Sequence, residues 1–357
     1  MTIELKKVTF RTGAETYIYE TSLTLETGGF NILLGATLSG KTTLMRLMAG
    51  LERPTSGEVW AGGKNVTGQP VQKRSVAMVY QSFINYPSFT VYDNIASPLK
   101  VAGLSKEEIN TKVQRLAELL KLTPMLNRLP RELSGGQQQR TALARALVKG
   151  ADLVLLDEPL ANLDYKLREE LRDELPKLFA DSGATVVYAT TEPLEALMLG
   201  GHTVTLKKGK VVQAGPTSAI YRQPASLECA RIFSDPPVNT AQVIKKGSTV
   251  SLGKVASWQV PEAMAALADG EYQIALRPHH LLPTQNGGGD VAVNGIVQIA
   301  EISGSESIIR VMIGDEIWVS QTPGIYSCVY GDTARFSFRT EHCMYFGKNN
   351  TLIDLSQ

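Results

Sequence analysis

A glycine-flanked loop between an apolar strand and a helical stretch constrains this chain more than any other feature. The apolar run 30–34 leads into the sequence GATLSGKT at 35–42, and residues 43–49 continue with helical character. A loop of the form G-x-x-x-x-G-K-[ST] in this context binds phosphate, because backbone N–H groups and the helix N-terminus point at the phosphate oxygens. A glycine turn that only caps a buried helix is the alternative. The predicted phosphate-binding residues are Gly35, Ala36, Thr37, Leu38, Ser39, Gly40, Lys41, Thr42 and Thr43.

Two side chains of the loop have separate predicted roles, and a second motif supplies carboxylates. We expect Lys41 to neutralise the outer phosphates and the Thr42 hydroxyl to ligate Mg²⁺. The apolar run 153–156 is followed by Asp157 and Glu158. Asp157 is expected to reach the Mg²⁺ shell, and Glu158 to orient or deprotonate the attacking water. Two carboxylates after a strand are equally compatible with a solvated turn, but the upstream loop favours the phosphate site.

The apolar runs predict a mixed α/β fold around a parallel sheet. Runs 30–34, 153–156 and 185–189 are short and uninterrupted, as expected of strands that are covered on both faces. Before them, the alternation of apolar and polar residues in 3–25 indicates paired antiparallel strands. The expected core is therefore a parallel sheet with an additional antiparallel β part.

A helical segment and a domain boundary follow from two local patterns. Ser105-Lys106-Glu107-Glu108 has the form of a capping box and precedes apolar residues at helical spacing. We therefore expect a helical subdomain at about 86–148. Near 235–237 the pattern changes to short strand-like runs that are separated by Gly, Asn and Asp turns. The expected domains are residues 1–235 and a β-rich module at 236–357.

Charge and cysteine content exclude several classes of protein. The formal net charge of +1 argues against a protein that binds nucleic acid through a broad basic surface. Three cysteines without CxxC spacing, Cys229, Cys328 and Cys343, indicate a reducing compartment rather than a disulfide framework. The N-terminal residues do not have the pattern of a signal peptide, and no apolar run reaches about 18 residues. Any role at a membrane is therefore expected to depend on partners.

The sequence Leu133-Ser134-Gly135-Gly136-Gln137 lies between the two phosphate motifs. A serine hydroxyl and glycine N–H groups at a helix start form an anion site. With this motif the chain resembles the ABC ATPase family, in which such a site closes over the γ-phosphate of ATP bound to the opposite subunit. The resemblance implies ATP and Mg²⁺ as ligands and a dimer as the working unit. The residues expected to bind the partner's ATP are Ser134, Gly135, Gly136 and Gln137.

The resemblance also assigns roles to the residues after the apolar run 76–80. Gln81 corresponds to the Q-loop glutamine, which contacts Mg²⁺, senses the attacking water and connects to the transmembrane subunits. The region from Gln81 to Ile95, rich in aromatic residues, is then the groove for the coupling helices of two permease subunits. An aromatic cluster that faces the core is the alternative. Residues 161–164 correspond to the D-loop.

Two positions depart from the family pattern. Thr191 stands where the family has a histidine that contacts the γ-phosphate, and Thr12 stands where an aromatic residue stacks on adenine, with Tyr17 and Tyr19 as candidate substitutes. The loss of one donor to a developing phosphoryl charge costs on the order of 10²- to 10³-fold in rate. We therefore predict slow turnover at this chain's own site and a second, unlike ATPase subunit. A homodimer and a non-hydrolysing regulatory subunit are the alternatives.

Residues 275–281, ALRPHHL, resemble the RPEHL element of the regulatory domain in carbohydrate-type ABC importers. The resemblance then covers nearly the whole chain and implies an OB-like C-terminal domain. It also implies import of a carbohydrate or of a polyol such as glycerol, with an extracytoplasmic solute-binding protein, at the cytoplasmic face of a bacterial inner membrane. A soluble ABC ATPase of translation or DNA repair is a different class. Such proteins usually have two fused ATPase halves or long coiled-coil insertions, and this sequence has neither.

Overall fold

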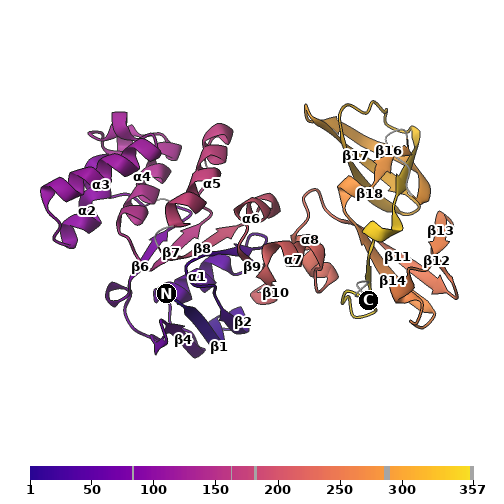
Figure 1. The fold of residues 1–357 in the computed structure, drawn as a ribbon, viewed down its shortest axis with the longest axis horizontal. Helices are drawn as coiled ribbons and strands as arrows, with labels where there is room; N and C mark the ends of the chain where they lie inside the picture. Colours follow the sequence, from indigo (N-terminus) through magenta and orange to yellow (C-terminus); the bar gives the residue numbers. More distant parts are fainter. Residues whose placement is uncertain (83, 162, 181–182, 285–289, 354–357) are drawn as a thin grey trace. The chain divides into compact units, whose positions relative to one another are not determined.

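The computed structural model of the 357-residue chain describes all residues except 83, 162, 181–182, 285–289 and 354–357. Contacts within the chain divide it into two units, Met1–Ser218 and Ala219–Gln357. In Figure 1 the first unit is coloured from indigo through magenta, and the β-rich second unit is orange to yellow.

A six-stranded sheet forms the centre of the first unit. Its strands are β3 (Phe30–Leu34), β6 (Val76–Val79), β7 (Leu153–Asp157), β8 (Thr185–Thr190), β9 (His202–Lys207) and β10 (Lys210–Pro216), in the order β10-β9-β3-β8-β7-β6. All neighbouring strands run parallel except β10, which pairs antiparallel with β9. Every residue of β3, β7 and β8 is buried, which confirms the prediction from their uninterrupted apolar sequences.

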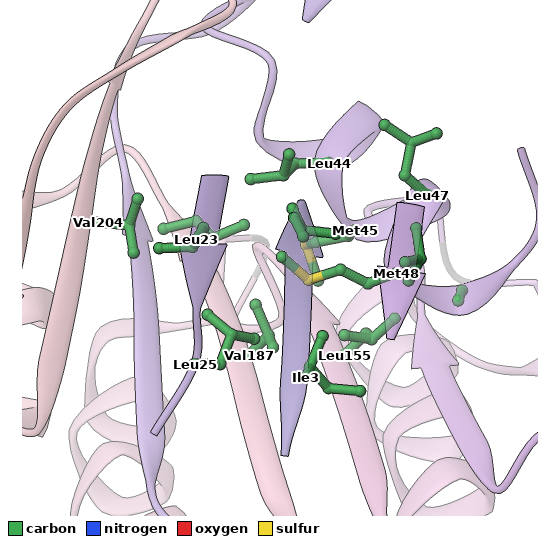
Figure 2. Close-up of a cluster of buried hydrophobic side chains, with 14 of the residues drawn as sticks. Ile3, Leu23, Leu25, Leu44, Met45, Leu47, Met48, Leu155, Val187 and Val204 are labelled. Atoms are coloured by element: carbon green, nitrogen blue, oxygen red, sulfur yellow. The ribbon is translucent and has the colours of Figure 1, made fainter. Parts of the chain in front are cut away.

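An antiparallel sheet and a helix complete the core of this unit. The sheet has the order β2-β1-β4-β5, with β1 (Ile3–Thr12), β2 (Glu15–Thr24), β4 (Ser56–Ala61) and β5 (Lys64–Asn65). Figure 2 shows Met45 and Met48 of helix α1 (Lys41–Ala49) among apolar side chains of β1, β7 and β8, including Ile3 and Leu155. Both methionines are almost fully buried, and each such burial stabilises the fold by about 1.5–3 kcal/mol. This packing fixes the helix that begins at the phosphate loop.

Several of the remaining helices of the first unit begin after a residue whose side chain caps the helix. The Ser105 side chain and Glu108 form both bonds of the predicted capping box, which confirms that local prediction. The helices are α2 (Val91–Val101), α3 (Lys106–Leu119), α4 (Gly135–Val148), α5 (Tyr165–Ala180) and α6 (Pro193–Leu199), and Figure 1 shows the first three grouped together. Short 3₁₀ turns are η1 (Val71–Lys73), η2 (Thr123–Met125) and η3 (Pro130–Glu132). Across the described parts of the chain, no helix is long and apolar enough to cross a membrane.

The second unit contains two five-stranded antiparallel sheets, as predicted for a β-rich module. One sheet has the order β13-β12-β11-β14-β20, with β11 (Asn239–Lys246), β12 (Thr249–Leu252), β13 (Ala256–Gln259), β14 (Gly270–Leu276) and β20 (Met344–Phe346). The other has the order β15-β19-β16-β17-β18, with β15 (Leu282–Pro283), β16 (Val291–Ile302), β17 (Glu306–Ile313), β18 (Glu316–Pro323) and β19 (Thr333–Phe338). One apolar core includes residues of both sheets, and in it the Trp258 indole donates to the Tyr345 hydroxyl over 2.9 Å.

The division between the units lies earlier in the chain than the expected boundary at 235/236. Helices α7 (Thr217–Arg222) and α8 (Leu227–Ile232) precede β11. Leu227 and Ala230 of α8 are buried in a cluster with Ala275 and Phe346 of the second unit. Because this packing joins α8 to a sheet far along the sequence, the change in local pattern near 235 does not mark the change in contacts.

Candidate nucleotide-binding site

The predicted phosphate loop connects the buried end of β3 to α1. Its first amide is held at the sheet, where the Gly35 N–H donates to the Thr190 carbonyl over 3.3 Å. Gly40 is the N-cap of α1 at φ 105°, and no described side chain caps the helix, so its first N–H groups point into the loop. A Cβ at Gly40 would lie 2.9 Å from the Ile18 Cδ1 atom. Glycine is therefore required at this position by both conformation and space.

Lys41 is the charged centre of the loop. Its side chain is 5% exposed, and its ammonium donates to the carbonyls of Gly35 and Ala36 over 2.7 and 3.2 Å. The Lys41 Nζ also lies 3.5 Å from the Glu158 Oε1 atom. Burial lowers the pKa of Lys41, and the charge of Glu158 opposes that shift. The buried Ser39 hydroxyl has no hydrogen-bond partner in the described structure, which fits a loop built to bind an additional polar group.

Thr42 and Asp157 meet at the end of β7, although 115 positions separate them in the sequence. The Thr42 hydroxyl donates to the Asp157 Oδ2 atom over 2.7 Å. Asp157 is 2% exposed, and burial raises its pKa while the bond from Thr42 opposes the increase. A hydroxyl and a carboxylate are the hard oxygen ligands that Mg²⁺ prefers, so this pair fits the predicted Mg²⁺ role.

Glu158 and Gln81 lie together beside the loop. The Gln81 amide donates to the Glu158 Oε2 atom over 3.1 Å, while the other carboxylate oxygen faces Lys41. Glu158 has a φ of 47°, and its N–H donates to the Ala189 carbonyl over 3.0 Å. A left-handed backbone at a non-glycine residue is strained, and such strain concentrates at functional sites. The backbone therefore turns this carboxylate out of the sheet and toward the loop.

Lys41, Thr42, Gln81 and Glu158 line a pocket of about 480 Å³ in the first unit, whereas Asp157 is not among the described lining residues. Most of the predicted phosphate loop lines the pocket, whereas Gly35 and Ala36 contribute only their carbonyls to Lys41. The pocket is lined by Glu15, Thr16, Tyr17, Tyr19, Thr37, Leu38, Ser39, Gly40, Lys41, Thr42, Thr43, Gln81, Glu158, Lys208 and Gly209. The candidate aromatic residues Tyr17 and Tyr19 are thus at the site, and Thr12 is not among the described lining residues.

The motif at 133–137 starts helix α4 outside this pocket. The Ser134 side chain accepts from the Gln137 N–H, and the Ser134 N–H donates to the Gln137 side chain over 3.0 Å. Ser134 and Gly135 are exposed, Gly136 is half-buried, and a Cβ at Gly135 would meet no atom of this chain within 4 Å. The start of this helix is therefore capped and exposed, and none of its residues is among the described residues that line the nucleotide pocket.

Comparisons with known proteins identify the family. Residues 18–161 match the family model that is described as ABC transporter. Over 323 residues, 86% of this chain and 87% of the relative, the chain is 38% identical to the trehalose/maltose import ATP-binding protein MalK of Thermococcus litoralis. The chain belongs to the ATP-binding proteins of ABC transporters. This membership confirms the predicted class of enzyme, an ABC-type ATPase.

Other relatives of this ABC protein match over nearly its whole length. The alpha-glucoside transport ATP-binding protein AglK of Rhizobium meliloti is 36% identical over 93% of the chain and 94% of the relative. The maltose/maltodextrin import ATP-binding protein MalK of Escherichia coli K12 is 33% identical over 98% of the chain and 96% of the relative. The predicted resemblance to ATP-binding subunits of carbohydrate-type importers is therefore confirmed.

Solved structures confirm the fold of the ABC ATPase part. One of them is the dimeric structure of a post-hydrolysis state of the ATP-binding cassette MJ0796 bound to ADP and Pi. It aligns with a TM-score of 0.56 at 30% identity, over 60% of this chain and 98% of that structure. A second structure with the same coverage is the dimeric structure of MJ0796, a bacterial ABC transporter cassette.

Thr191 lies directly after β8 and is exposed, and it is not among the described residues that line the pocket. Its neighbour Glu192 pairs with Arg168 over 3.1 Å, and Arg168 also donates to the Ala161 carbonyl over 3.2 Å. In this ABC protein, the segment after β8 is thus tied to the start of the predicted D-loop. Within that loop, Asn162 lies outside the described residues.

Sequence reasoning missed a buried carboxyl group that is hydrogen-bonded to the end of β8. The Glu195 Oε2 atom of α6 accepts from the Thr190 hydroxyl over 2.6 Å and from the Tyr188 hydroxyl over 3.1 Å. Burial raises the pKa of Glu195. The signal available in the sequence was a single glutamate among apolar residues of a short helix, which does not show that it points toward the end of β8. Glu15, Thr16, Lys208 and Gly209 of the pocket lining were also missed.

Proposed function

We propose that this chain is the ATP-hydrolysing subunit that powers carbohydrate import through an ABC transporter. The observation that carries the proposal is the convergence of Thr42, Asp157, Gln81 and Glu158 on the phosphate loop. Three separate segments of the sequence supply these side chains. Together with the full-length similarity to sugar-import ATP-binding proteins, this geometry supports ATP hydrolysis coupled to transport.

Each side chain of the site has a distinct role in the proposed reaction. Thr42, Asp157 and Gln81 would hold Mg²⁺, which would neutralise negative charge on the phosphates. Lys41 neutralises the outer phosphates from within the loop. Glu158 accepts a hydrogen bond from the attacking water or takes its proton, and Gln81 fixes the orientation of the Glu158 carboxylate.

The ion pair between Lys41 and Glu158 has a consequence for the order of events. Because the Lys41 ammonium lies 3.5 Å from the Glu158 carboxylate, the two side chains partly neutralise each other. A triphosphate in the loop competes for Lys41. Glu158 then loses part of this interaction and is available to the attacking water. ATP binding thus prepares the carboxylate for its role.

The surface at the start of α4 supports a dimeric working unit. Ser134 and Gly135 are exposed and lie outside their own chain's pocket. We propose that Ser134, Gly135, Gly136 and Gln137 bind the γ-phosphate of ATP held by a partner subunit. The two dimeric structures of the cassette MJ0796 support such an arrangement.

The segment that follows Gln81 supports contact with permease subunits. Ile84, Tyr86 and Phe89 are 58%, 48% and 42% exposed, whereas the buried Asn94 side chain donates to the carbonyls of Tyr86 and Phe89. The backbone is thus held rigidly while apolar side chains face outward, contrary to an aromatic cluster in the core. Phe83 lies outside the described residues. We propose this surface as the docking site for transmembrane subunits at the cytoplasmic face of the membrane.

Two narrower proposals concern the cargo and the second ATPase subunit. The sequence-based predictions are a polyol such as glycerol and an unlike ATPase partner, both with an extracytoplasmic solute-binding protein. Thr191 is the observation that favours the unlike partner. The names of the relatives refer to maltose, trehalose and alpha-glucosides, and they support a carbohydrate rather than glycerol in particular.

Substitution of Glu158 tests the proposed function directly. In the transporter purified with its native partners, Glu158→Gln keeps the size of the side chain and removes its charge. We expect ATP hydrolysis at this chain's site to fall by about 10²- to 10³-fold while ATP binding is retained, as for the loss of one catalytic group. Single-turnover hydrolysis and equilibrium binding of ATP measure the two effects.

Glu20→Gln, an exposed position on β2 outside the described pocket lining, is the matched control and should leave both quantities unchanged. The proposal would be wrong if wild-type complex did not bind ATP, or if Glu158→Gln hydrolysed it at the wild-type rate in a complex whose ATPase subunits are both copies of this chain. If hydrolysis in the complex depends only on the equivalent glutamate of a second, unlike subunit, the unlike-partner hypothesis is supported.

A further inference from the structure

A second pocket, of about 340 Å³, lies entirely within the second unit and shares no described lining residue with the nucleotide pocket. Its lining combines α7, the 3₁₀ turns η5 (Pro278–His280) and η7 (Thr340–His342), and the last strand. The lining residues are Tyr221, Arg222, Gln223, Arg277, His280, Glu341, His342, Cys343, Met344, Leu352 and Ile353. The proposed ATPase reaction uses none of them.

Arg277 is the unusual residue of this pocket, because it is a buried cation without a counter-charge. It is 5% exposed, and its guanidinium donates to the carbonyls of Phe233 and Tyr221 over 3.1 and 2.7 Å and stacks on the Tyr221 ring at 3.6 Å. No carboxylate pairs with it within the described part of the chain. These two bonds use two of the five guanidinium N–H groups.

Among the described residues, the other buried basic side chains all have a carboxylate partner. Lys41, Arg172 and Lys245 have carboxylate partners at 3.5, 2.7 and 3.0 Å. A buried charge without a partner is costly, and buried charges are therefore normally paired. Burial lowers the pKa of Arg277, but an arginine remains charged in proteins. The positive charge beside the pocket is thus retained at every physiological pH.

Three imidazoles lie at the same place and offer ring nitrogens for hydrogen bonds. The rings of His280 and His342 stack at 3.9 Å with an angle of 17°, and the ring of His279 lies 4.2 Å from that of His280. Burial and the neighbouring cationic groups lower the pKa of His280 to about 4. Stacked rings direct their nitrogens sideways instead of toward one point, and the described residues contain no metal-binding group of His, Cys, Asp and Glu. An anion is therefore the chemistry that this cluster suits.

The other titratable groups near the pocket do not neutralise the positive charge of Arg277. Glu341 is exposed, and its carboxylate lies 3.3 Å from Arg339 and 3.9 Å from the His342 imidazole. Burial raises the pKa of the Cys343 thiol to about 12, so that it carries no charge. The charged and titratable groups around the pocket are Tyr221, Arg222, Arg277, His279, His280, Arg339, Glu341, His342 and Cys343.

We propose that this pocket of the second unit is an effector site for a small phosphate-bearing ligand, with Arg277, Arg222, His280 and His342 around the phosphate group. Arginine binds phosphate oxygens through parallel N–H groups, and a histidine that gains a phosphate partner becomes easier to protonate. The pocket volume exceeds that of inorganic phosphate alone and falls in the range of small-molecule sites. A phosphate ester of a small metabolite fits better than free phosphate. The site is independent of the proposed ATPase function.

The histidines themselves provide the test, because the chain has only four. His279, His280 and His342 belong to the cluster, and His202 lies in the first unit and serves as an internal control. In full-length protein labelled at histidine Cε1, glucose 6-phosphate should shift the NMR signals of His280 and His342 and raise the pKa of His280. The signal of His202 should not move. Inorganic phosphate should act in the same way at higher concentration, and glucose, acetate and sodium chloride of equal ionic strength should not.

Two variants distinguish binding at this pocket from a general effect of charge. Arg222 is exposed at the rim, so Arg222→Ala should leave the fold intact and weaken glucose 6-phosphate binding about tenfold, as for the loss of a charge-assisted hydrogen bond. Arg231→Ala removes the same charge from an exposed position of α8 outside the described lining and should not change the affinity.

Three results would overturn the proposal. They are unmoved signals of His280 and His342 at millimolar phosphate ester, equal shifts with sodium chloride, and equal effects of Arg222→Ala and Arg231→Ala. A response to acetate that matches the response to the phosphate ester would exclude a phosphate-selective site. Loss of ATP binding at the first unit would not affect any of these readouts.

Discussion

Tyr17 is positioned as one wall of the nucleotide pocket by its neighbours on two sides. Its hydroxyl donates to the Glu15 carboxylate over 2.9 Å, and its ring lies 6.2 Å from that of Phe10. The side chain is still 41% exposed and lines the pocket together with the phosphate loop. Burial of one aromatic face against an adenine contributes about 1 kcal/mol beyond the area removed from water.

We therefore expect Tyr17→Ala to weaken ATP binding about fivefold, the equivalent of about 1 kcal/mol. Binding of tripolyphosphate, which has no base, should remain unchanged because the phosphate loop is intact. Thr12→Ala is the control, since Thr12 is exposed and is not among the described lining residues. Calorimetric titration measures the affinity of the wild type and of both variants for ATP and for tripolyphosphate. An equal loss of affinity for both ligands would show that Tyr17 acts on the loop and not on adenine.

Glu195 gives a prediction on pH that depends on its burial. Because burial raises the pKa of Glu195 above its ordinary value of 4.5, folding favours the protonated carboxyl. Its contribution to stability is therefore present below that ordinary value and is lost as pH rises through the folded-state pKa. Glutamine at this position can still accept from Tyr188 and Thr190 and does not ionise.

Glu195→Gln should accordingly melt at a higher temperature than the wild type at neutral pH, and the difference should shrink as the pH falls. Differential scanning calorimetry at acidic and neutral pH checks the sign. A difference that grows on acidification would show that the carboxylate, and not the protonated carboxyl, is the form favoured by the fold.

At the scale of elements, one residue at the start of helix α4 has two roles. Ser134 caps the helix, and it is also the residue proposed to contact the partner's ATP. Alanine at this position would remove both functions. Aspartate caps a helix as well as serine does, but its charge repels a triphosphate.

Ser134→Asp is thus expected to leave the melting temperature unchanged and to abolish dimerisation in the presence of ATP. Ser105→Asp makes the same change at the capping box of α3 and should affect neither property. Sedimentation with and without ATP reports the association. If Ser134→Asp protein still formed ATP-dependent dimers like the wild type, the proposed contact would be excluded.

Elements with strong local patterns could be predicted, and features that depend on distant packing could not. The loop at 35–42 and the buried strands β3, β7 and β8 follow from spacing and uninterrupted apolar runs. The contact of Gln81 with Glu158 depends on β6 lying next to β7, and it was not predicted from the sequence. Tyr17 was left as one of two candidates because the pairing of β1 with β2 contains register shifts that the sequence does not reveal.

For the whole molecule, the open question is whether the working dimer contains two copies of this chain or one copy and an unlike subunit. The two arrangements should differ in how their rate of ATP hydrolysis responds to a substitution of Thr191. In a homodimer both sites have threonine at this position, and each lacks one donor to the developing charge. In an assembly with an unlike subunit, the competent site of the partner sets most of the rate.

Thr191→His is the substitution that separates the two arrangements. A homodimer should hydrolyse ATP faster by up to about 10²-fold, since one positioned donor is restored at both sites. An assembly with a competent unlike subunit should change little, because its faster site is unaltered. Thr191→Val is the matched control, as it removes the hydroxyl without adding a donor. Steady-state hydrolysis by the purified complex, together with the intact mass of the copurified subunits, measures rate and stoichiometry on one sample. A homodimer whose rate does not rise would show that Thr191 is not the cause of slow turnover.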